Sequence, residues 1–416
     1  MDNITQILKD AAAATSQIKV LSAQKKQEIL EALAQEILEN SSLIISENQK
    51  DLDRMPDEDP KKDRLLLNES RIKALASSVL EVAILEDPTD KIISETHLAN
   101  GLFIQKKTAA LGVVGVIYES RPNVTIDVAA LCIRSGNVCL LRGGSDAEAT
   151  NLCLVNIIQK ILIKFDLNPN IVQLLPTDRK HVEELLTADK YVDILIPRGS
   201  QSLIDFVRKN AKVPVIETGA GVCHTYVERT ANLENAARII HNAKVSRPSV
   251  CNALDTVLID ELIAADLIPL MAKLLAKDEV EIFADDKAFD LLKGINYPHL
   301  IKAQSEDFGR EFLSLKCSVK IVQDINQALT HIKEFSSKHS EAIVSESPQQ
   351  IEKFLNEVDA AAVYANASTR FTDGGVFGLG AEIGISTQKL HARGPFALEK
   401  LVTEKWVVRG EGQIRE

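Results

Sequence analysis

The sequence has little of what marks a specialised chain. Its 416 residues include only 19 glycines and 13 prolines, while 45% are hydrophobic and 26% are charged. This balance excludes a fibrous or disordered protein, and the length predicts two or three folded domains. Positive charge is also short, because the net charge is −11. We therefore expect no binding to nucleic acid or to an anionic membrane surface, since phosphate contacts need clustered cations.

Long hydrophobic runs are absent too. The most apolar long stretch, residues 254–275, is interrupted by four acidic residues and one lysine, so no membrane span is expected. The N-terminus does not combine a basic region with an apolar core, so we expect no secretory signal. The sequence thus predicts a cytoplasmic protein without a membrane partner.

Metal-binding cysteine motifs are the third absence. None of the six cysteines lies in a CxxC pair or in a Cys/His cluster with zinc spacing, so no metal is expected. Cys251 has a distinct context, because Lys244 and Arg247 precede it in a polar loop and cations lower the pKa of a thiol. This context fits a nucleophile and an inert packing thiol equally well.

What the chain does contain is a regular alternation of helical and strand patterns. The first hundred residues predict amphipathic helices, and residues 102–111 predict a solvent-facing strand or hairpin. From residue 112 short apolar runs alternate with helices, which is typical of βαβ units and parallel sheets. The expected strands are residues 113–118, 138–141, 171–175, 191–196, 213–217, 254–259, 279–283, 319–322, 342–344 and 360–364. We predict two tandem α/β domains that meet near residues 217–223, and an edge strand around Trp406.

Two expected strands end in similar turns. Arg142-Gly-Gly-Ser145 and Arg198-Gly-Ser200 each precede a predicted helix, and free amides at a helix start suit an anion or a nucleotide. Ser145 and Glu148 also have the spacing of a capping box. Each turn alone fits an ordinary βα connection, but two in neighbouring units favour a ligand, since ligands gather at the carboxyl ends of parallel strands.

Other motifs carry positive charge or glycine. The tripeptide Ser-Arg-Pro occurs at Arg121 and again at Arg247. Such a pair suits a clamp for an acidic substrate, and chance recurrence would explain it as well. Residues 370–386 are rich in glycine, which allows close backbone approach to a ligand or simply forms a long connecting loop.

Several long motifs together resemble one family. They are residues 115–123 (GVIYESRPN), 141–145 (LRGGS), 216–221 (IETGAG), 247–252 (RPSVCN) and 377–394 (FGLGAEIGISTQKLHARG). In this order they resemble the γ-glutamyl phosphate reductases, which belong to the aldehyde dehydrogenase superfamily. The resemblance spans almost the whole chain and includes no preceding kinase domain.

The resemblance implies an architecture. The expected fold is aldehyde dehydrogenase-like α/β, with two doubly wound domains and a small β arm for oligomerisation. The implied NADPH-binding domain comprises residues 1–98 and 113–217, and the catalytic domain comprises residues 218–386. The arm would consist of residues 99–112 and 387–416.

The resemblance also implies roles for single residues. The nucleophile falls on Cys251 and the superfamily's glutamate on Glu217. The cofactor ribose contact falls on Arg142; Ser145 replaces the carboxylate of NAD users, which favours NADPH. The remaining implied residues are Gly199, Ser200 and Gly219 for the cofactor, Asn123 for the oxyanion, and Arg121 and Arg247 for the substrate phosphate. The superfamily's Trp-Asn motif is missing, so Arg121 and Asn123 compete for the oxyanion role.

The implied reaction is the NADPH-dependent reduction of L-glutamyl 5-phosphate to L-glutamate 5-semialdehyde, through a cysteine thioester, in proline biosynthesis. A homo-oligomer is expected, with glutamate 5-kinase as a candidate partner. Two alternatives stay open. One is an aldehyde dehydrogenase that hydrolyses its thioester with Glu217 as base, and the other is an inactive nucleotide-binding scaffold.

Overall fold

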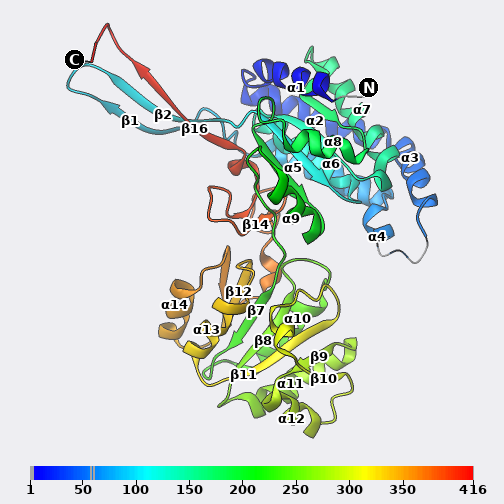
Figure 1. Ribbon diagram of the computed structural model, residues 1–416, viewed down its shortest axis with the longest axis vertical. Helices are drawn as coiled ribbons and strands as arrows, with labels where there is room; N and C mark the ends of the chain where they lie inside the picture. Colours follow the sequence, from blue (N-terminus) through cyan, green and yellow to red (C-terminus); the bar gives the residue numbers. More distant parts are fainter. Residues whose placement is uncertain (1–3, 57–58, 60, 416) are drawn as a thin grey trace. The chain divides into compact units, whose positions relative to one another are not determined.

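The computed structural model describes residues 4–56, 59 and 61–415, and its α/β architecture confirms the predicted class (Figure 1). The chain forms two units. Unit 1 consists of Met1–Thr218, Gly378–Gly384 and Pro395–Glu416, and unit 2 of Gly219–Phe377 and Ile385–Gly394. The cofactor and catalytic roles expected for these parts of the chain stay predictions.

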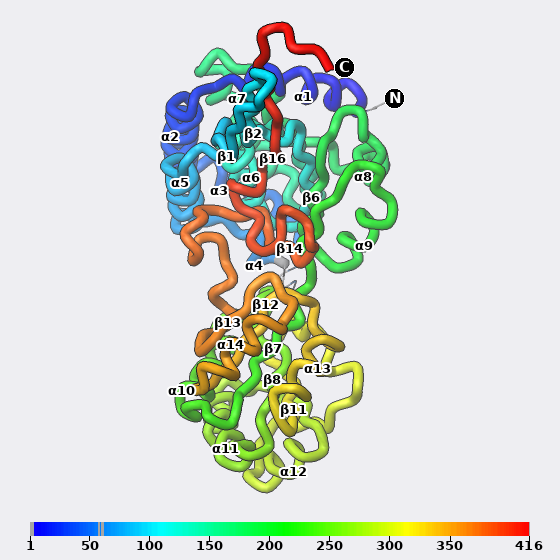
Figure 2. Tube along the Cα trace, turned by 90° about the vertical axis from the view of Figure 1, so that its left-hand side faces the viewer, coloured from blue at the N-terminus to red at the C-terminus, as the bar shows by residue number. Residues whose placement is uncertain are grey.

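Unit 1 begins with helices, as the early sequence predicts. They are α1 (Thr5–Ile18), α2 (Ala23–Glu39), α3 (Ser41–Asp53), α4 (Lys61–Leu65) and α5 (Glu69–Ile84). Side-chain caps start two of them, since Ser22 accepts the amide of Lys25 and Asn68 that of Arg71. Figure 2 shows α2 and α5 side by side. Each of the two helices buries an apolar stripe at helical spacing.

A four-stranded parallel sheet follows in unit 1. Its strands are β3 (Val113–Tyr118), β4 (Val138–Arg142), β5 (Val172–Leu174) and β6 (Ile194–Arg198), in the spatial order β5-β4-β3-β6. The connecting helices are α6 (Pro122–Arg134), α7 (Glu148–Lys164) and α8 (Arg179–Leu186), and α9 (Gln201–Asn210) follows β6. The order reverses between β3 and β6, which defines a doubly wound sheet with its switch point there.

One expected strand is wrong. Residues 213–217 make only an isolated bridge between Leu195 and Val215. Pro214 provides a carbonyl to the amide of Leu195 but has no N–H of its own, so the ladder does not extend.

A three-stranded antiparallel arm completes unit 1. β1 (Ile92–His97), β2 (Phe103–Ala110) and β16 (Val402–Arg409) pair in the order β1-β2-β16, which confirms the edge strand around Trp406. Figure 1 shows these strands extending away from the helices of unit 1. Trp406 is 61% exposed.

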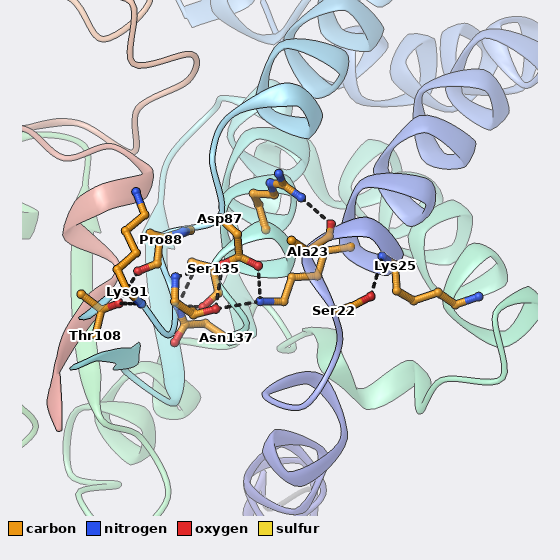
Figure 3. Close-up of polar contacts among 12 residues, drawn as sticks. Ser22, Ala23, Lys25, Asp87, Pro88, Lys91, Thr108, Ser135 and Asn137 are labelled. Atoms are coloured by element: carbon orange, nitrogen blue, oxygen red, sulfur yellow. Dashed lines mark hydrogen bonds and ion pairs between the residues drawn. The ribbon is translucent and has the colours of Figure 1, made fainter. Parts of the chain in front are cut away.

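Polar contacts fix the root of this arm (Figure 3). Asn137 receives the amide of Gly112 at 2.8 Å and donates to the carbonyl of Leu401 at 2.8 Å, so it joins the starts of β3 and β16. Beside it, the buried Lys26 pairs with Asp87 at 2.9 Å. The arm is therefore anchored to the first helices by satisfied buried groups rather than by apolar packing alone.

Unit 2 contains a seven-stranded parallel sheet in the order β10-β9-β11-β8-β7-β12-β13. The strands are β7 (Cys223–Val227), β8 (Leu254–Asp260), β9 (Glu281–Ala284), β10 (Leu300–Lys302), β11 (Lys316–Val322), β12 (Ser340–Val344) and β13 (Ala362–Ala365). The helices are α10 (Leu233–Val245), α11 (Ala264–Leu275), α12 (Asp286–Gly294), α13 (Ile325–Phe335) and α14 (Pro348–Glu357). A short pair, β14 (Ile385–Ser386) and β15 (Gly394–Pro395), lies outside this sheet.

The two faces of this sheet carry separate apolar clusters. Val227 and Ile259 pack with α10, α11 and α12, whereas Tyr226 and Leu258 pack with α13 and α14. Neighbouring residues of a strand point to opposite faces, so the central strands β7, β8, β11 and β12 contribute to both clusters. In the described part of the chain, no helix is long and apolar enough to cross a membrane.

Candidate active site

The candidate cofactor residues of unit 1 gather at one edge of its sheet. Arg121 follows β3, Arg142 ends β4, and Gly199 and Ser200 follow β6. All three strands are parallel, so these positions stand at their common carboxyl edge. The structure therefore brings together the residues that the sequence places in separate turns.

Arg142 is one of the cations at this edge. Its Nη2 donates to the carbonyl of Thr177 at 2.6 Å, and its buried Nε has no hydrogen-bond partner among the described residues. Burial lowers the pKa of the guanidinium, and Asp146 and Asp178 oppose this effect. Ser145 is exposed close by in the chain. A half-buried arginine with an unsatisfied donor is suited to an anionic ligand.

The start of α7 does not have the predicted cap. Ser145 begins a short 3₁₀ turn and α7 begins at Glu148, so the Ser145–Glu148 capping box is wrong. The buried Asp51 of α3 accepts the amide of Thr150 at 2.8 Å and that of Ala149 at 3.2 Å. A protein carboxylate thus already accepts two of the free amides at the start of this helix.

At the switch point, Glu119 bridges the ends of β3 and β6. Its carboxylate accepts the amide of Ser200 at 3.0 Å and the Ser200 hydroxyl at 3.1 Å. A Cβ on Gly199 would lie 2.7 Å from the same carboxylate, so the turn needs glycine or a moved Glu119. The predicted cofactor loop is therefore in contact with a carboxylate that the sequence alone did not single out for this role.

Asn123 is the second residue of α6. Its exposed amide donates to Asp127 at 3.2 Å, and Ser78 donates to the same carboxylate at 3.2 Å. Burial raises the pKa of Asp127 to about 6, against these bonds and the charge of Arg198. The oxyanion role of Asn123 stays a prediction, and Arg121, at the N-cap of α6, is half-buried.

Glu217 is held within unit 1. Its carboxylate lies 3.6 Å from Nη1 of Arg208, and its side chain is 17% exposed. The pairing places this carboxylate beside an arginine on α9. The base role that the superfamily assigns to this glutamate stays a prediction.

In unit 2 the nucleophile candidate occupies a different setting. Cys251 lies in the loop between α10 and β8, and it alone of the six cysteines is not fully buried. The other thiols lie in apolar packing; burial raises the pKa of Cys317 to about 12. Exposure therefore separates Cys251 from the other five thiols, whereas its sequence context fitted a nucleophile and an inert packing thiol equally well.

The backbone under Cys251 is tightly packed. A Cβ on Gly221 would lie 1.5 Å from the carbonyl oxygen of Cys251, so no larger residue fits there without moving the loop. The thiol of Cys223 donates to the same carbonyl at 3.2 Å. Gly219 is less restricted, since its Cβ would meet the Thr387 hydroxyl at 3.0 Å.

One expected cation near Cys251 is wrong and another was missed. Lys244 is fully buried, 3.6 Å from Asp255, and donates to the carbonyl of Ser314, so its charge is used inside unit 2. Arg370 instead reaches the cysteine loop, donating to Ser246 at 3.1 Å and to the side chain of Asn252. The sequence marked this segment only by its glycines.

Arg247 is exposed on the same loop. Burial lowers the pKa of Arg370, and the charge of Arg247 lowers it further. Within the described residues, no group of three or more His, Cys, Asp or Glu side chains is placed to hold a metal ion. The chemistry of this loop thus rests on one thiol and two guanidinium groups.

Comparison with known proteins identifies the class first. A sequence model of the aldehyde dehydrogenase family matches residues 1–289. An acetylating aldehyde dehydrogenase from Geobacillus thermoglucosidasius shares the fold, with a TM-score of 0.71 at 16% identity over 99% of this chain and 97% of the other. The fold and the matched region are those of the aldehyde dehydrogenases, a family of NAD(P)-dependent oxidoreductases.

Closer relatives narrow the class. A γ-glutamyl phosphate reductase from Legionella pneumophila (strain Paris) is 52% identical over 100% of this chain and 99% of its own length. One from Bacteroides fragilis is 49% identical over 100% of both chains. The crystal structure of the Thermotoga maritima enzyme matches with a TM-score of 0.95 at 39% identity, covering 100% of both chains.

The chain therefore belongs to the γ-glutamyl phosphate reductases, also called glutamate-5-semialdehyde dehydrogenases. It acts in proline biosynthesis, where it reduces L-glutamyl 5-phosphate to the semialdehyde. This result supports the acyl phosphate reductase over both the hydrolytic dehydrogenase and the inactive scaffold.

Proposed function

We propose that Cys251 is the nucleophile of this reduction and that the reaction passes through a thioester on its sulfur. The observation that carries the proposal is the setting of Cys251 in unit 2. It is the partly exposed thiol of the chain, its carbonyl is fixed by Gly221 and Cys223, and two arginines lie on or against its loop. Nearby cations favour the thiolate, which is the reactive form.

The proposed reduction forms and breaks a covalent bond to the sulfur of Cys251. The Cys251 thiolate attacks the acyl carbon, the carbon–oxygen bond to the phosphoryl group breaks, and inorganic phosphate leaves. Hydride addition converts the thioester to a thiohemiacetal oxyanion. This oxyanion collapses, the carbon–sulfur bond breaks, and the aldehyde and the thiolate are released. No water is consumed, so Glu217 is not required as a base in this direction.

We propose NADPH as the reductant, and its role when bound is to supply the hydride. The residues of unit 1 fit a 2′-phosphate, because Arg142 has an unsatisfied buried Nε and Ser145 leaves an exposed hydroxyl where a carboxylate would repel. Gly199 and Ser200 would hold the cofactor at the switch point, where Glu119 now accepts two hydrogen bonds from Ser200. Gly219 is the further backbone contact.

The departing phosphate needs positive charge. We assign this task to Arg121 and Arg247, with Asn123 as the oxyanion donor. Arg247 is exposed on the nucleophile loop itself, which supports its share of the assignment. Guanidinium groups suit phosphate oxygens because their planar N–H donors form paired bonds.

We further propose a cytoplasmic homo-oligomer joined through the arm, with glutamate 5-kinase as a candidate partner that supplies the acyl phosphate. The arm supports the first point, since β16 is an edge strand with Trp406 61% and Val408 55% exposed. Exposed apolar side chains on a strand whose outer edge has no neighbouring strand favour association with another chain. Light scattering of the chain and of a Trp406→Glu variant tests it.

The first test of the mechanism runs the reaction backwards. Glutamate 5-semialdehyde and NADP⁺ are supplied with and without inorganic phosphate, and NADPH absorbance is followed. We expect NADPH only with phosphate, and we expect Cys251→Ser to abolish it while NADPH binding stays. Cys153→Ser, which alters a buried thiol on α7, is the matched control and should keep its activity. Near-normal turnover by Cys251→Ser would overturn the mechanism.

A further inference from the structure

Arg370 is the charged side chain that contacts both ends of the Cys251 loop. Nε donates to the Ser246 hydroxyl at 3.1 Å, just after α10 ends, and Nη1 donates to Oδ1 of Asn252, directly after the cysteine. The guanidinium therefore spans the loop that carries the nucleophile. Neither contact is predictable from the chain order, because Arg370 lies more than a hundred residues further on.

The backbone around Arg370 locks the same loop. Thr369 donates its hydroxyl to the carbonyl of Asn252 at 2.7 Å, and the Asn252 amide donates to the carbonyls of Thr372 at 2.9 Å and Arg370 at 3.3 Å. The Asn252 side chain is thereby used as donor and acceptor at once. The segment 369–372 fixes the residue next to Cys251, so the position of Arg370 relative to the loop is well defined.

The loop needs a side-chain cation for a physical reason. It follows the carboxyl end of α10, where the helix dipole is negative and gives no help to a thiolate. Lys244 is spent on Asp255, which leaves Arg247 and Arg370 as the cations of this region. The charges of the two guanidinium groups repel each other and Asp373 opposes this effect, so an anion bound between the two groups would relieve the repulsion further.

We propose that Arg370 is a positioning residue of the reaction: it braces the Cys251 loop and places a fixed positive charge beside the thiol and beside Arg247. The inference rests on the proposed role of Cys251. It adds a second arginine to the anion site, so that the thiolate and the departing phosphate are both stabilised by groups of unit 2.

Other titratable groups surround this pair. Asp373 follows on the same segment and opposes the mutual effect of the two arginines. From β7, Cys223 faces both Arg370 and Cys251, and burial raises its pKa well above the usual value. The nearby charges of Glu341 and Asp255 raise the pKa of Cys223 further. Arg370 and Arg247 are thus the groups of unit 2 that favour a thiolate at Cys251 over these acids.

The test measures the ionisation of Cys251 without turnover. Full-length enzyme is alkylated with iodoacetamide across pH 5 to 10, and the modified cysteine is identified by mass spectrometry. We expect Arg370→Met to move the midpoint for Cys251 upward by about one pH unit or more, since a nearby opposite charge shifts a pKa by that order. Arg370→Lys should restore most of the shift, and the exposed Arg238→Met on α10 should cause none.

A second readout concerns the phosphate. In the reverse assay we expect Arg370→Met to raise the KM for phosphate and to lower kcat about 10-fold or more, whereas the KM for NADP⁺ stays. An unchanged alkylation midpoint with unchanged phosphate KM would overturn the inference. Loss of activity in Arg370→Met with an unchanged midpoint would assign it a structural role only. These outcomes are separate from failure of the proposed function, which Cys251→Ser reports.

Discussion

The two units carry their candidate residues at opposite edges of their parallel sheets. In unit 1, Arg142, Gly199 and Ser200 stand where strands end, at the carboxyl edge. In unit 2, Cys251 lies just before β8 begins, beside Gly221 and Cys223 at the start of β7. The carboxyl edge of a sheet provides turns that lead into helices, which suit a dinucleotide. The amino edge follows helix ends and must obtain positive charge from arginines.

The same contrast appears in how rigid the two sites are. The Glu119–Ser200 contact in unit 1 joins exposed side chains, which a ligand can replace at little cost. The Cys251 loop in unit 2 is fixed by the backbone contact of Gly221 with the carbonyl of Cys251 and by the hydrogen bond from Asn252 to the carbonyl of Thr372. A cofactor edge tolerates rearrangement, whereas a nucleophile needs a preorganised position.

The largest expected effect comes from disturbing the backbone contact that fixes the Cys251 loop. Gly221→Ala would place a methyl group 1.5 Å from the carbonyl oxygen of Cys251, where backbone cannot yield cheaply. The loop must move, and a shift of about 1 Å at a nucleophile costs about 100-fold in rate. Steady-state kinetics should show kcat lowered by about 100-fold, with binding of NADPH to unit 1 unchanged.

Gly294→Ala is the matched control for that change. Gly294 ends α12 in the same unit, and a Cβ there meets nothing within 4 Å. We expect wild-type kinetics from this variant. Equal loss in both variants, or full activity in Gly221→Ala, would show that the contact under Cys251 does not set its position.

The sequence predicted one edge better than the other. Short apolar runs identified β3, β4 and β6, and the glycine turns after β4 and β6 supplied the candidate cofactor positions, which stay predictions. β7 was missed because His224 and Thr225 interrupt its apolar pattern. Both are fully buried, and Nδ1 of His224 pairs with Glu341 at 3.0 Å, a partner on β12 that sequence spacing does not reveal.

Long-range contacts account for the other misses. Arg370 reaches Cys251 only because β12, β13 and the following turn bring residues 369–372 to the start of β8. Lys244 is next to the cysteine loop in sequence, yet its side chain turns inward to Asp255. Local charge therefore identified the Cys251 loop as a candidate, but it pointed to Lys244, whose charge is used by Asp255, and not to Arg370.

The stability of unit 2 should depend on pH through one buried histidine. His331 on α13 is buried between Phe308 and Phe335, and burial, with the charges of His224 and Lys320, lowers its pKa to about 2. The unfolded histidine takes up a proton below about pH 6.5 and the folded one does not, so stability is lost as the pH falls. His331→Phe should remove about 2 kcal/mol of the loss between pH 7 and pH 5.

Urea unfolding followed by circular dichroism at the two pH values measures this change, and the fluorescence of Trp406 follows the arm of unit 1 separately. The exposed His391→Phe is the control and should keep the wild-type pH dependence. A His331→Phe variant with the same acid loss as wild type would show that other buried groups of unit 2 determine it.

The last expected effect concerns the cofactor edge of unit 1. Arg142→Met removes the guanidinium whose Nε is unsatisfied, while β4 keeps its packing. A charge-assisted bond to a phosphate is worth about 1.5–3 kcal/mol, so the KM for NADPH should rise about 10- to 100-fold. NADH lacks the 2′-phosphate and is the internal control, so its KM should change little. Equal increases for both cofactors would place Arg142 against a part that they share, and the carboxyl edge would then bind a dinucleotide without selecting between the two.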